Sequence, residues 1–217
     1  MKLYAVYGAS GFGREVMPLV RDQFCATEND KSEIVFIDDR PPASEVNGHK
    51  VFTYNEFIRL DSSEKNVCIA IANSSIRETL ARRCKADGLK PFSVHARNTI
   101  VMDSVEIGDG AILCPFVTIT SGIRIGSFFH ANIYSYVAHD CTIGDFVTFA
   151  PGVMCNGNVK VEDHAYIGTG AILHHGNPGE PLVIGRGAIV AMGAVVRKDV
   201  SPGAMVAGNP ARIFNQA

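Results

Sequence analysis

The sequence predicts an α/β domain of Rossmann-like type at residues 1–90, followed by an all-β domain, a parallel β-helix, at residues 91–217. Two observations predict this order. Residues 2–94 alternate short apolar segments with helical segments around a glycine-rich turn, and residues 101–196 carry an apolar residue at every sixth position. A period of six fits neither a helix nor a lone alternating strand, whereas hexapeptide repeats are typical of a β-helix.

The first domain is predicted from the order of its elements. Its third strand is almost continuously apolar, as parallel strands covered on both faces are. Asn73 is expected to cap the second helix, and Gly88 is expected to end it. The expected strands cover residues 2–7, 33–37, 66–72 and 90–94, and the expected helices cover residues 14–24 and 74–86. This β-α-β-β-α-β order indicates a small Rossmann-like unit.

The turn after the first strand, residues 8–13 (Gly-Ala-Ser-Gly-Phe-Gly), is the candidate phosphate site of this domain. Glycine-rich turns of this kind direct free backbone N–H groups and a helix N-terminus toward an anion. Asp38 and Asp39 follow the second strand, where carboxylates can accept hydrogen bonds from a ribose or a base. A tight turn without a ligand is the alternative. The unit has too few strands for NAD, so a nucleoside diphosphate carried by a sugar suits it better.

The repeat of the second domain can be followed in steps of six from Val101 to Leu173, through thirteen consecutive apolar positions. It then slips by five residues and resumes at Ile184. Three hexads are expected to form one coil, so that residues eighteen apart stack at the strand spacing of about 4.8 Å. The glycine that often follows the apolar position is expected to allow a tight turn. Hexapeptide prisms of this type resemble the left-handed β-helix family, and this resemblance implies the hand of the coil.

Composition argues against several classes of function. Twenty basic and 22 acidic side chains give no electrostatic signature of binding to nucleic acid or to a membrane surface. We expect neither partner, since the sequence also lacks a signal peptide and a run of eighteen apolar residues. The six cysteines show no CxxC pair, and Cys141 and Cys155 fall in buried columns of the repeat. A reducing, cytoplasmic location is therefore expected.

The phase of the repeat places His139 on the outer face of the prism, two residues after an apolar position. Eighteen residues further on, the same face carries Gly157, and His175 follows on the next coil. An exposed histidine beside a carboxylate, here Asp140, is the minimal arrangement of a general base, because the carboxylate orients the imidazole. A solvated surface histidine is the alternative interpretation.

Residues 174–181 contain the five-residue slip and are expected to project outward, either as an ordinary surface loop or as a flap over a ligand or a neighbour. A zinc site is a competing hypothesis, because His139 and His175 match two of the three histidine ligands of the γ-carbonic anhydrases. Glu180 stands where the third histidine belongs, and zinc chemistry of that kind requires three nitrogen ligands. We therefore expect no metal.

The whole chain resembles the sugar O-acyltransferase family of sialic-acid O-acetyltransferase type. Within it, the chain is most similar to the bacterial N-acetyltransferases of nucleotide-linked 4-amino-4,6-dideoxy sugars. The resemblance lies in the opening Tyr-Gly-Ala-Ser-Gly-Phe-Gly, in Ala138–Asp145 (Ala-His-Asp-Cys-Thr-Ile-Gly-Asp), and in the ending Gly-Asn-Pro-Ala-Arg. It implies a homotrimer with each active site between neighbouring prisms, and acetyl-CoA as the cosubstrate along that cleft.

The resemblance also implies roles for individual residues. His139 matches the catalytic base, Asp140 the acid that orients it, and Gly157 the glycine whose amide faces the thioester oxygen. The residues matched to CoA binding are Gly157, Met192, Gly193 and Ala194 along the pantetheine arm, and Arg212 near the phosphates. The residues expected at the nucleotide-sugar site are Gly8, Ser10, Gly11, Phe12, Asp38, Asp39 and Asn73.

Two positions depart from the family pattern. Phe12 stands where many members have a histidine, so the diphosphate contact made there must be absent or replaced. Thr148 stands where some members carry a second active-site histidine. These departures leave the exact sugar open.

We therefore predict an acetyl-CoA-dependent N-acetyltransferase that acetylates the C4 amine of a dTDP- or UDP-linked 4-amino-4,6-dideoxyhexose for surface polysaccharide synthesis. In this prediction, His139 accepts the proton of the amine during attack, and the N–H of Gly157 stabilises the oxyanion. Two alternatives stay open. One is O-acetylation of a sialic-acid-like or other sugar, and the other is a nucleotide-sugar-binding trimer without catalysis.

Overall fold

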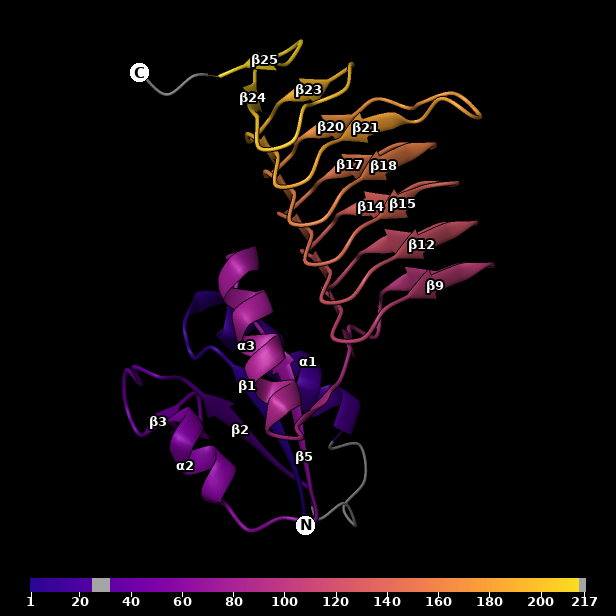
Figure 1. The fold of residues 1–217 in the computed structure, drawn as a ribbon. Coiled ribbons are helices and arrows are strands. Elements are labelled where there is room, and N and C mark those ends of the chain that lie inside the picture. Colours follow the sequence, from indigo (N-terminus) through magenta and orange to yellow (C-terminus); the bar gives the residue numbers. More distant parts are fainter. Residues whose placement is uncertain (25–31, 215–217) are drawn as a thin grey trace. The chain divides into compact units, whose positions relative to one another are not determined.

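The structure is a computed structural model that describes residues 1–24 and 32–214, and its chain divides into two compact units (Figure 1). The first unit comprises Met1–His95 together with Asp109–Ile112, and the second comprises Ala96–Gly108 together with Leu113–Ala217. Across the described residues, no helix is both long enough and apolar enough to span a membrane.

The first unit contains a six-stranded sheet in the order β3-β4-β2-β1-β5-β6. Its strands are β1 (Lys2–Tyr7), β2 (Glu33–Ile37), β3 (Glu45–Val46), β4 (His49–Phe52), β5 (Glu64–Ile69) and β6 (Lys90–Pro91). All neighbours pair in parallel except β3 and β4. The chain moves outward from β1 to β2 and then crosses to β5 on the other side of β1. Ligands of α/β sheets bind at the carboxyl ends of the strands where the order reverses in this way.

Three helices connect these strands: α1 (Gly11–Phe24), α2 (Tyr54–Arg59) and α3 (Ser74–Ala86). The predicted cap of α3 is confirmed, because the side chain of Asn73 accepts a hydrogen bond from the N–H of Ile76 at 3.0 Å. Gly88 follows α3 with φ +75°, a conformation that glycine adopts without steric cost. Helix α1 starts at Gly11, three residues earlier than predicted, so that the second half of the glycine-rich turn belongs to its first turn.

Residues 45–59 contain structure that the predicted order lacks. Strands β3 and β4 form a hairpin whose two turn residues, Asn47 and Gly48, both have positive φ. An Asn-Gly pair is the typical signal of such a turn. Helix α2 begins with a capping box between Thr53 and Glu56, which the Thr-x-x-Glu spacing also signals. The order β-α-β-β-α-β was therefore wrong in omitting this hairpin and this helix.

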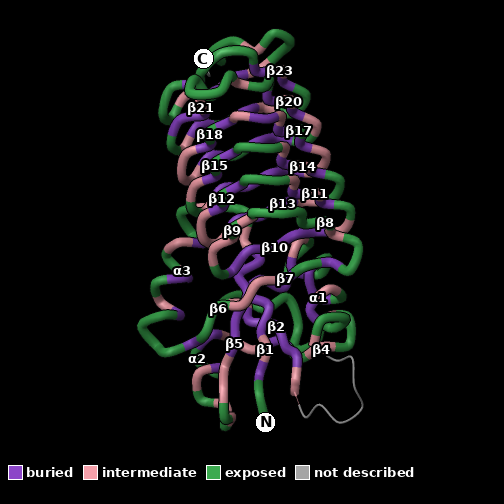
Figure 2. Tube along the Cα trace, turned by 90° about the vertical axis from the view of Figure 1, so that its right-hand side faces the viewer, coloured by how far each residue is buried: buried purple, intermediate pink, exposed green. Residues whose placement is uncertain are grey.

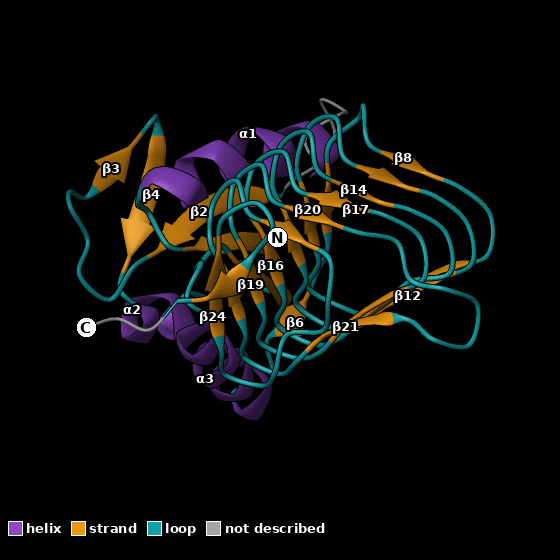
Figure 3. Ribbon diagram, turned by 90° about the horizontal axis from the view of Figure 1, so that it is seen from above, coloured by secondary structure: helices purple, strands orange, loops and turns teal. Residues whose placement is uncertain are grey.

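The remaining strands form three sheets of short stacked segments, which pair in parallel except for β24 with β25 and are seen along the stack in Figure 3. The first prism sheet contains β8 (Ile100–Val101), β11 (Thr118–Ile119), β14 (Tyr136–Val137), β17 (Met154–Cys155), β20 (Ile172–Leu173) and β23 (Val195–Val196). The second contains β9 (Val105–Ile107), β12 (Ile123–Ile125), β15 (Thr142–Ile143), β18 (Val159–Val161) and β21 (Leu182–Ile184). The third contains β7 (Val94–His95), β10 (Ile112–Leu113), β13 (His130–Ala131), β16 (Thr148–Phe149), β19 (Tyr166–Ile167), β22 (Ile189–Val190), β24 (Met205–Ala207) and β25 (Arg212–Ile213).

The strand register confirms the predicted eighteen-residue stacking. In the first prism sheet Ile119 pairs with Val101 on one side and with Val137 on the other. Leu173 pairs with Val196, twenty-three residues later, so the five extra residues leave the stack between β20 and β21. They extend beyond the other turns (Figure 1), as expected. Most of the repeated aliphatic side chains and of the column four residues later are buried and form the core of the prism; buried positions are purple in Figure 2. Val101, the first residue of the repeat, is exposed.

The glycines that follow the repeated aliphatic residue serve a different purpose from the predicted one. Gly108, Gly126 and Gly144 do not have positive φ, but a Cβ there would lie 2.6–2.7 Å from a backbone nitrogen of the next coil. The left-handed conformation occurs two residues after these glycines, for example at Phe128 and Phe146. The tight-turn interpretation was therefore wrong: close stacking of the coils excludes a side chain at these positions.

The turns of successive coils stack into three edges of the prism. The edge between the first and second prism sheets consists of residues 102–104, 120–122, 138–140, 156–158 and 174–181. We call it the His139 edge.

Candidate active site

His139 and Asp140 form a hydrogen-bonded pair on the His139 edge. Asp140 has φ +59°, and in this turn conformation its Oδ2 lies 2.8 Å from Nδ1 of His139. Both side chains are largely exposed, at 63% and 64%. When Nδ1 carries the proton that is donated to the carboxylate, Nε2 is the acceptor nitrogen. The pair therefore presents a general base that is accessible from outside the prism.

Gly157 lies under the ring of His139. A Cβ at position 157 would be 2.6 Å from both Nε2 and Cε1 of His139, so any larger residue would displace the imidazole. The N–H of Asn158 donates to the carbonyl of His139 at 3.0 Å, which fixes the two coils against each other. The predicted stacking of His139 on Gly157 is thus present in the structure.

The N–H of Gly157 has no hydrogen-bond acceptor among the described residues. At equivalent turn positions on another edge, the backbone N–H groups do have acceptors. The N–H groups of Ser127 and Asp145 donate to the carboxylates of Asp145 and Asp163 on the next coil, at 2.7 and 2.9 Å. A buried N–H without a partner is costly to leave in a folded protein. The Gly157 N–H is therefore a donor available to a ligand next to Nε2 of His139.

Two polar side chains near this glycine were not predicted from the sequence. Tyr136 donates its hydroxyl to Oδ1 of Asn156 at 2.9 Å, and Nδ2 of Asn156 donates to the carbonyl of Leu173 at 2.7 Å. Burial raises the pKa of Tyr136, so the hydroxyl keeps its proton at neutral pH. The sequence feature that could have pointed to Asn156 is its position directly before Gly157.

His175 occupies the coil after Gly157, as predicted, and the N–H of the following Gly176 donates to the carbonyl of Gly157 at 3.0 Å. Its ring stacks on that of His174 with 4.2 Å between the centroids. Nδ1 of His174 also lies 2.8 Å from the carbonyl oxygen of His175. These interactions order the start of the inserted segment 174–181.

Other predicted residues lie elsewhere on the prism. Met192, Gly193 and Ala194 form the turn between β22 and β23, on the edge between the third and first prism sheets. Thr148 belongs to β16 of the third prism sheet and is buried. Within one chain, these residues are therefore on a different edge from His139.

A groove of about 590 Å³ lies at the carboxyl-terminal end of the prism. Arg212 lines it, as do Arg197 and Lys198, which the sequence reasoning had not singled out. Lys198 follows Val196 by two residues, the same phase as His139. Asp199, the acidic residue in the lining, accepts a hydrogen bond from the N–H of Val183 at 2.9 Å. Three basic groups at one groove favour an anion such as a phosphate.

The glycine-rich turn of the first unit borders a pocket of about 430 Å³. Ser10, Gly11 and Asp38 line it, together with Arg14 and Arg40. Oδ2 of Asp38 accepts from the N–H of Ala9, and its Oδ1 accepts from the N–H of Arg40, both at 2.9 Å. This carboxylate therefore holds the glycine-rich turn and the start of the next loop together. The two arginines were missed, although both are close in sequence to predicted site residues.

Asp39, in the bend after β2, does not line this pocket. Its Oδ2 accepts the hydroxyl of Tyr7 at 2.6 Å and lies 3.7 Å from Nη1 of Arg83. The guanidinium of Arg83 in turn lies 3.7 Å from the ring centroid of Tyr54. Burial is the main cause that raises the pKa of Tyr7. Asp39 thus takes part in a network that joins β1 and α3.

The remaining residues predicted for the nucleotide-sugar site surround the turn without lining the pocket. Gly8 has φ +114°, and a Cβ there would lie 2.9 Å from Cδ1 of Ile71, so glycine is required at the end of β1. Phe12 is in the first turn of α1, and Asn73 caps α3. Neither side chain belongs to the lining of this pocket.

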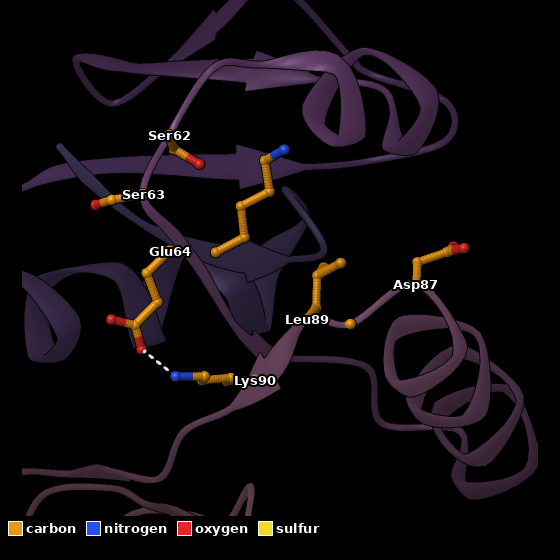
Figure 4. Close-up of a pocket in the computed structure, with 8 residues that line it drawn as sticks. Ser62, Ser63, Glu64, Asp87, Leu89 and Lys90 are labelled. Atoms are coloured by element: carbon orange, nitrogen blue, oxygen red, sulfur yellow. Dashed lines mark hydrogen bonds and ion pairs between the residues drawn. The ribbon is translucent and has the colours of Figure 1, made fainter.

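A second pocket of the first unit, of about 300 Å³, lies at the amino ends of β5 and β6 (Figure 4). Glu64 forms ion pairs there with Lys90 at 3.1 Å and with Lys2 at 3.6 Å. The hydrogen bond from Lys90 is the main cause that lowers the pKa of Glu64. The ion pairs of Glu64 tie β1, β5 and β6 together, at the opposite end of the sheet from the glycine-rich turn.

No group of three or more histidine, cysteine, aspartate or glutamate side chains suited to a metal ion occurs in residues 1–24 and 32–214. In particular, His139 is engaged by Asp140, and the ring of His175 is stacked on His174.

Comparison with known proteins identifies the family. Residues 4–84 match the PglD N-terminal domain. Over 212 residues the chain is 48% identical to the GDP-perosamine N-acetyltransferase of Escherichia coli O157:H7, covering 98% of this chain and 96% of that protein. The chain belongs to the family of nucleotide-linked amino-sugar N-acetyltransferases.

Solved structures agree with this family. The acetyltransferase is 56% identical to WeeI from Acinetobacter baumannii AYE, with a TM-score of 0.95 over 99% of this chain and 100% of that chain. It is 30% identical to the acetyltransferase domain of PglB from Neisseria gonorrhoeae FA1090 in complex with acetyl coenzyme A, with a TM-score of 0.86 over 98% of each chain. The predicted family and the predicted acyltransferase activity are confirmed.

Proposed function

We propose that this acetyltransferase transfers the acetyl group of acetyl-CoA to the C4 amine of a nucleotide-linked 4-amino-4,6-dideoxyhexose, for synthesis of a surface glycan. The observation that carries this proposal is the His139–Asp140 pair above Gly157, with an accessible base nitrogen next to an unpaired N–H. The near full-length similarity to a GDP-perosamine N-acetyltransferase supports an amino sugar as the acceptor.

The chemistry follows from the positions of Nε2 and the Gly157 N–H. The neutral amine attacks the thioester carbonyl carbon and forms the C–N bond, while Nε2 of His139 removes a proton from the nitrogen. General-base assistance of this kind contributes about a hundred- to ten-thousandfold in rate. The oxyanion that develops on the carbonyl oxygen accepts a hydrogen bond from the N–H of Gly157, and such a donor is worth on the order of 3 kcal/mol.

Asp140 acts on the imidazole throughout the reaction. Its Oδ2 fixes the ring orientation through Nδ1 and stabilises the imidazolium that forms when Nε2 takes the proton. When the tetrahedral intermediate collapses, the C–S bond breaks. His139 then returns its proton to the departing CoA thiolate, which completes the cycle with a neutral imidazole and an amide product.

The groove at the carboxyl-terminal end of the prism is the proposed site of the CoA phosphates. Arg197, Lys198 and Arg212 supply positive charge there, and Lys198 lies on the same edge as His139. A CoA molecule whose thioester is at Gly157 would extend toward this groove along successive coils. We also propose that the coils are left-handed, as the hexapeptide repeat and the family resemblance imply.

The pocket beside the glycine-rich turn is the proposed site of the nucleoside diphosphate. Arg14 and Arg40 border the N-terminus of α1, so they can supply the diphosphate contact that a histidine makes where this chain has Phe12. The residues that line this pocket do not indicate which nucleobase the substrate carries. The relative from Escherichia coli is named for a GDP-linked sugar, whereas the sequence reasoning favoured dTDP or UDP, and all three belong in the test.

Replacing Arg14 or Arg40 with alanine should raise KM for the nucleotide sugar about ten- to a hundredfold, because each loses a charge-assisted hydrogen bond worth roughly 1.5–3 kcal/mol. KM for acetyl-CoA should stay unchanged. Steady-state kinetics with each substrate varied in turn measures both constants. Arg21→Ala is the matched control, since Arg21 is in the last turn of the same helix. An equal rise in both KM values would contradict this placement of the diphosphate.

We propose that the protein is a homotrimer, because one side of the prism is apolar and another is charged. Ile100, Phe116, Tyr134 and Met154 are exposed on the first prism sheet and its edge with the third. Phe116 and Tyr134 stack with 4.8 Å between ring centroids, and both have positive φ, which is unusual for bulky residues. A continuous exposed apolar surface marks an interface. Contact between copies along this surface would bring Met192–Ala194 of one chain toward His139 of another.

Tyr134→Asp should convert the trimer to a monomer, because a carboxylate in an apolar interface cannot be desolvated without cost. Aspartate tolerates the left-handed backbone at this position, so the far-UV circular dichroism should not change. Size-exclusion chromatography with light scattering measures the mass of the assembly. N-acetyltransferase activity should fall when the trimer is lost. Lys160→Asp, on the charged second prism sheet, is the control. A wild-type protein that is monomeric and fully active would refute the proposal.

The function itself is tested by thiol release from acetyl-CoA with GDP-, UDP- and dTDP-linked sugars that carry either an amine or a hydroxyl at C4. We expect turnover with a 4-amino sugar, beginning with GDP-perosamine. Turnover of the hydroxyl sugars alone would favour the O-acetyltransferase alternative, and binding without turnover would favour the scaffold. We place the reaction in the cytoplasm, consistent with the five cysteines of the described residues, which are free and buried.

A further inference from the structure

The free N–H of Gly157 belongs to the peptide bond between Asn156 and Gly157, and the carbonyl of this bond is held from inside the prism. Sγ of Cys141 lies 3.2 Å from the carbonyl oxygen of Asn156, and Sγ of Cys155 lies 3.8 Å from it. Within the described residues, these two thiols are the donors that reach this oxygen. Both cysteine side chains are buried, so the carbonyl faces the core.

The direction of the carbonyl determines the direction of the N–H. A peptide bond is planar and trans, so its C=O and N–H groups point in opposite directions. A carbonyl of Asn156 that is turned toward the buried thiols therefore turns the N–H of Gly157 outward, onto the His139 edge. This is the side on which Nε2 of His139 lies.

The other hydrogen bonds of this turn fix the groups on either side of the peptide. The backbone N–H of Asn156 donates to the carbonyl of Leu173 at 3.3 Å, and its Nδ2 donates to the same oxygen at 2.7 Å. The carbonyl of Gly157 accepts from the N–H of Gly176 at 3.0 Å. The peptide between Asn156 and Gly157 itself is held through the thiols.

The two thiols form a short chain of hydrogen bonds. The hydrogen bond between them raises the pKa of Cys155 and lowers that of Cys141, as expected when Cys155 donates to Sγ of Cys141. The N–H of Val159 also donates to this sulfur, at 3.4 Å. The proton of Cys141 is then directed to the carbonyl of Asn156. Successive hydrogen bonds in a chain polarise one another, which makes the N–H of the same peptide a stronger donor.

The core does not require thiols at these two positions. One coil earlier the equivalent residues are Ile123 and Val137, and one coil later they are Val159 and Leu173. These aliphatic side chains fill the same columns but cannot donate to the equivalent carbonyls. Within these two columns, the thiols therefore occur at the coil whose turn contains Gly157.

We infer that Cys141, supported by Cys155, is a positioning residue for acetyl transfer. It holds the peptide before Gly157 so that the N–H faces the thioester oxygen, and it acts from the core without touching either substrate. Sγ of Cys141 also lies 3.6 Å from the carbonyl of His139, but that carbonyl already accepts from the N–H of Asn158 at 3.0 Å. Loss of the thiol therefore acts on the oxyanion donor and not on the base. This inference rests on the proposed function.

Cys141→Val tests the role of the thiol, because valine fills the same position one coil later, at Val159. It should lower kcat about tenfold, which is part of the hundred- to thousandfold that a complete oxyanion donor contributes. Both KM values should stay unchanged, because the N–H acts on the transition state. Cys141→Ser keeps a donor and should retain kcat within about threefold of the wild type. Ile123→Val is the matched control in the same column and should leave kcat unchanged.

Stability separates this role from packing. Valine suits the apolar core better than serine, whose buried hydroxyl is costly, so Cys141→Val should melt at a higher temperature than Cys141→Ser. Activity should follow the opposite order, with the serine variant the less stable and the more active of the two. Steady-state kinetics and thermal melting measure both orders. A valine variant with wild-type kcat, or a serine variant no more active than the valine variant, would overturn the inference.

Infrared spectroscopy of bound acetyl-CoA tests the N–H without turnover. A hydrogen bond to the thioester oxygen lowers the C=O stretching frequency, and a ¹³C label on that carbonyl separates its band from those of the protein. The frequency should be lower on the wild-type enzyme and on Cys141→Ser than in free acetyl-CoA, and it should return toward the free value on Cys141→Val. An equal lowering on the wild type and on Cys141→Val would overturn the inference.

This measurement also separates the inference from the proposed function, because it needs no acceptor sugar. If the wild-type enzyme turned over no 4-amino sugar, the proposed function would be lost, whereas a frequency shift that depends on Cys141 would still support the positioning role. If the enzyme turned over the sugar and Cys141→Val kept the wild-type kcat, only the positioning role would be wrong.

Discussion

Replacing His139 with alanine should lower kcat for N-acetylation by about a hundred- to ten-thousandfold, the usual contribution of a general base. Nε2 of this histidine is the proposed base nitrogen and lies next to the free N–H of Gly157. KM for acetyl-CoA and for the nucleotide sugar should change little, because the ring acts on the proton and not on substrate binding. Steady-state kinetics over a range of pH measures the effect.

The split between kcat and KM separates a base from a residue that binds a substrate, because only kcat should fall in His139→Ala. His164→Asn is a suitable control, because His164 also has positive φ, at 61°, but lies on another edge, stacked on Phe146. A His139→Ala enzyme with more than half of the wild-type rate would remove the base assignment while leaving the family intact.

Gly157→Ala should lower kcat about a hundredfold, although it adds a single methyl group. The new Cβ would lie 2.6 Å from Nε2 of His139, so the imidazole must move, and a displacement of about 1 Å in a reacting group can cost this much. The substitution should leave the thermal midpoint of unfolding nearly unchanged, because the ring is exposed and can rotate away. Steady-state kinetics measures the fall in kcat, and a thermal melting curve measures the midpoint of unfolding.

The double variant shows whether the methyl group acts through the ring. In a His139→Ala background, Gly157→Ala should have little further effect on kcat, because the displaced group is already absent. Fully additive losses would show instead that the methyl group blocks the thioester or its oxyanion directly. The glycine would then be a substrate-contacting residue independent of His139.

Much of the prism and its reactive pair could be predicted because one spacing is repeated many times. Thirteen apolar positions in phase leave a single register, and that register also places Gly157 one coil beyond His139. The reason for the glycines that follow the repeated apolar residue could not be predicted from the period. A period shows where glycines recur, but not that Gly108 and Gly126 face backbone of the next coil.

The first unit was less predictable, because its elements do not repeat. The different partners of Asp38 and Asp39 could not be predicted, because both residues lie after the end of β2, where side chains need not alternate as they do in a strand. Arg14 and Arg40 could not be assigned either, since their approach to one pocket depends on how α1 and the loop after β2 fold together.

The stacking of the coils also limits how such an enzyme can change its length. Because each edge recurs every eighteen residues, adding a whole coil between Gly157 and Lys198 would lengthen the distance between the proposed thioester site and the proposed CoA-phosphate site by about 4.8 Å. Adding a single hexad would move every later residue to a different edge. The length of the prism can therefore change only by whole coils. Smaller adjustments to the distance between two sites on one edge can come only from loops that leave the stack, such as residues 174–181.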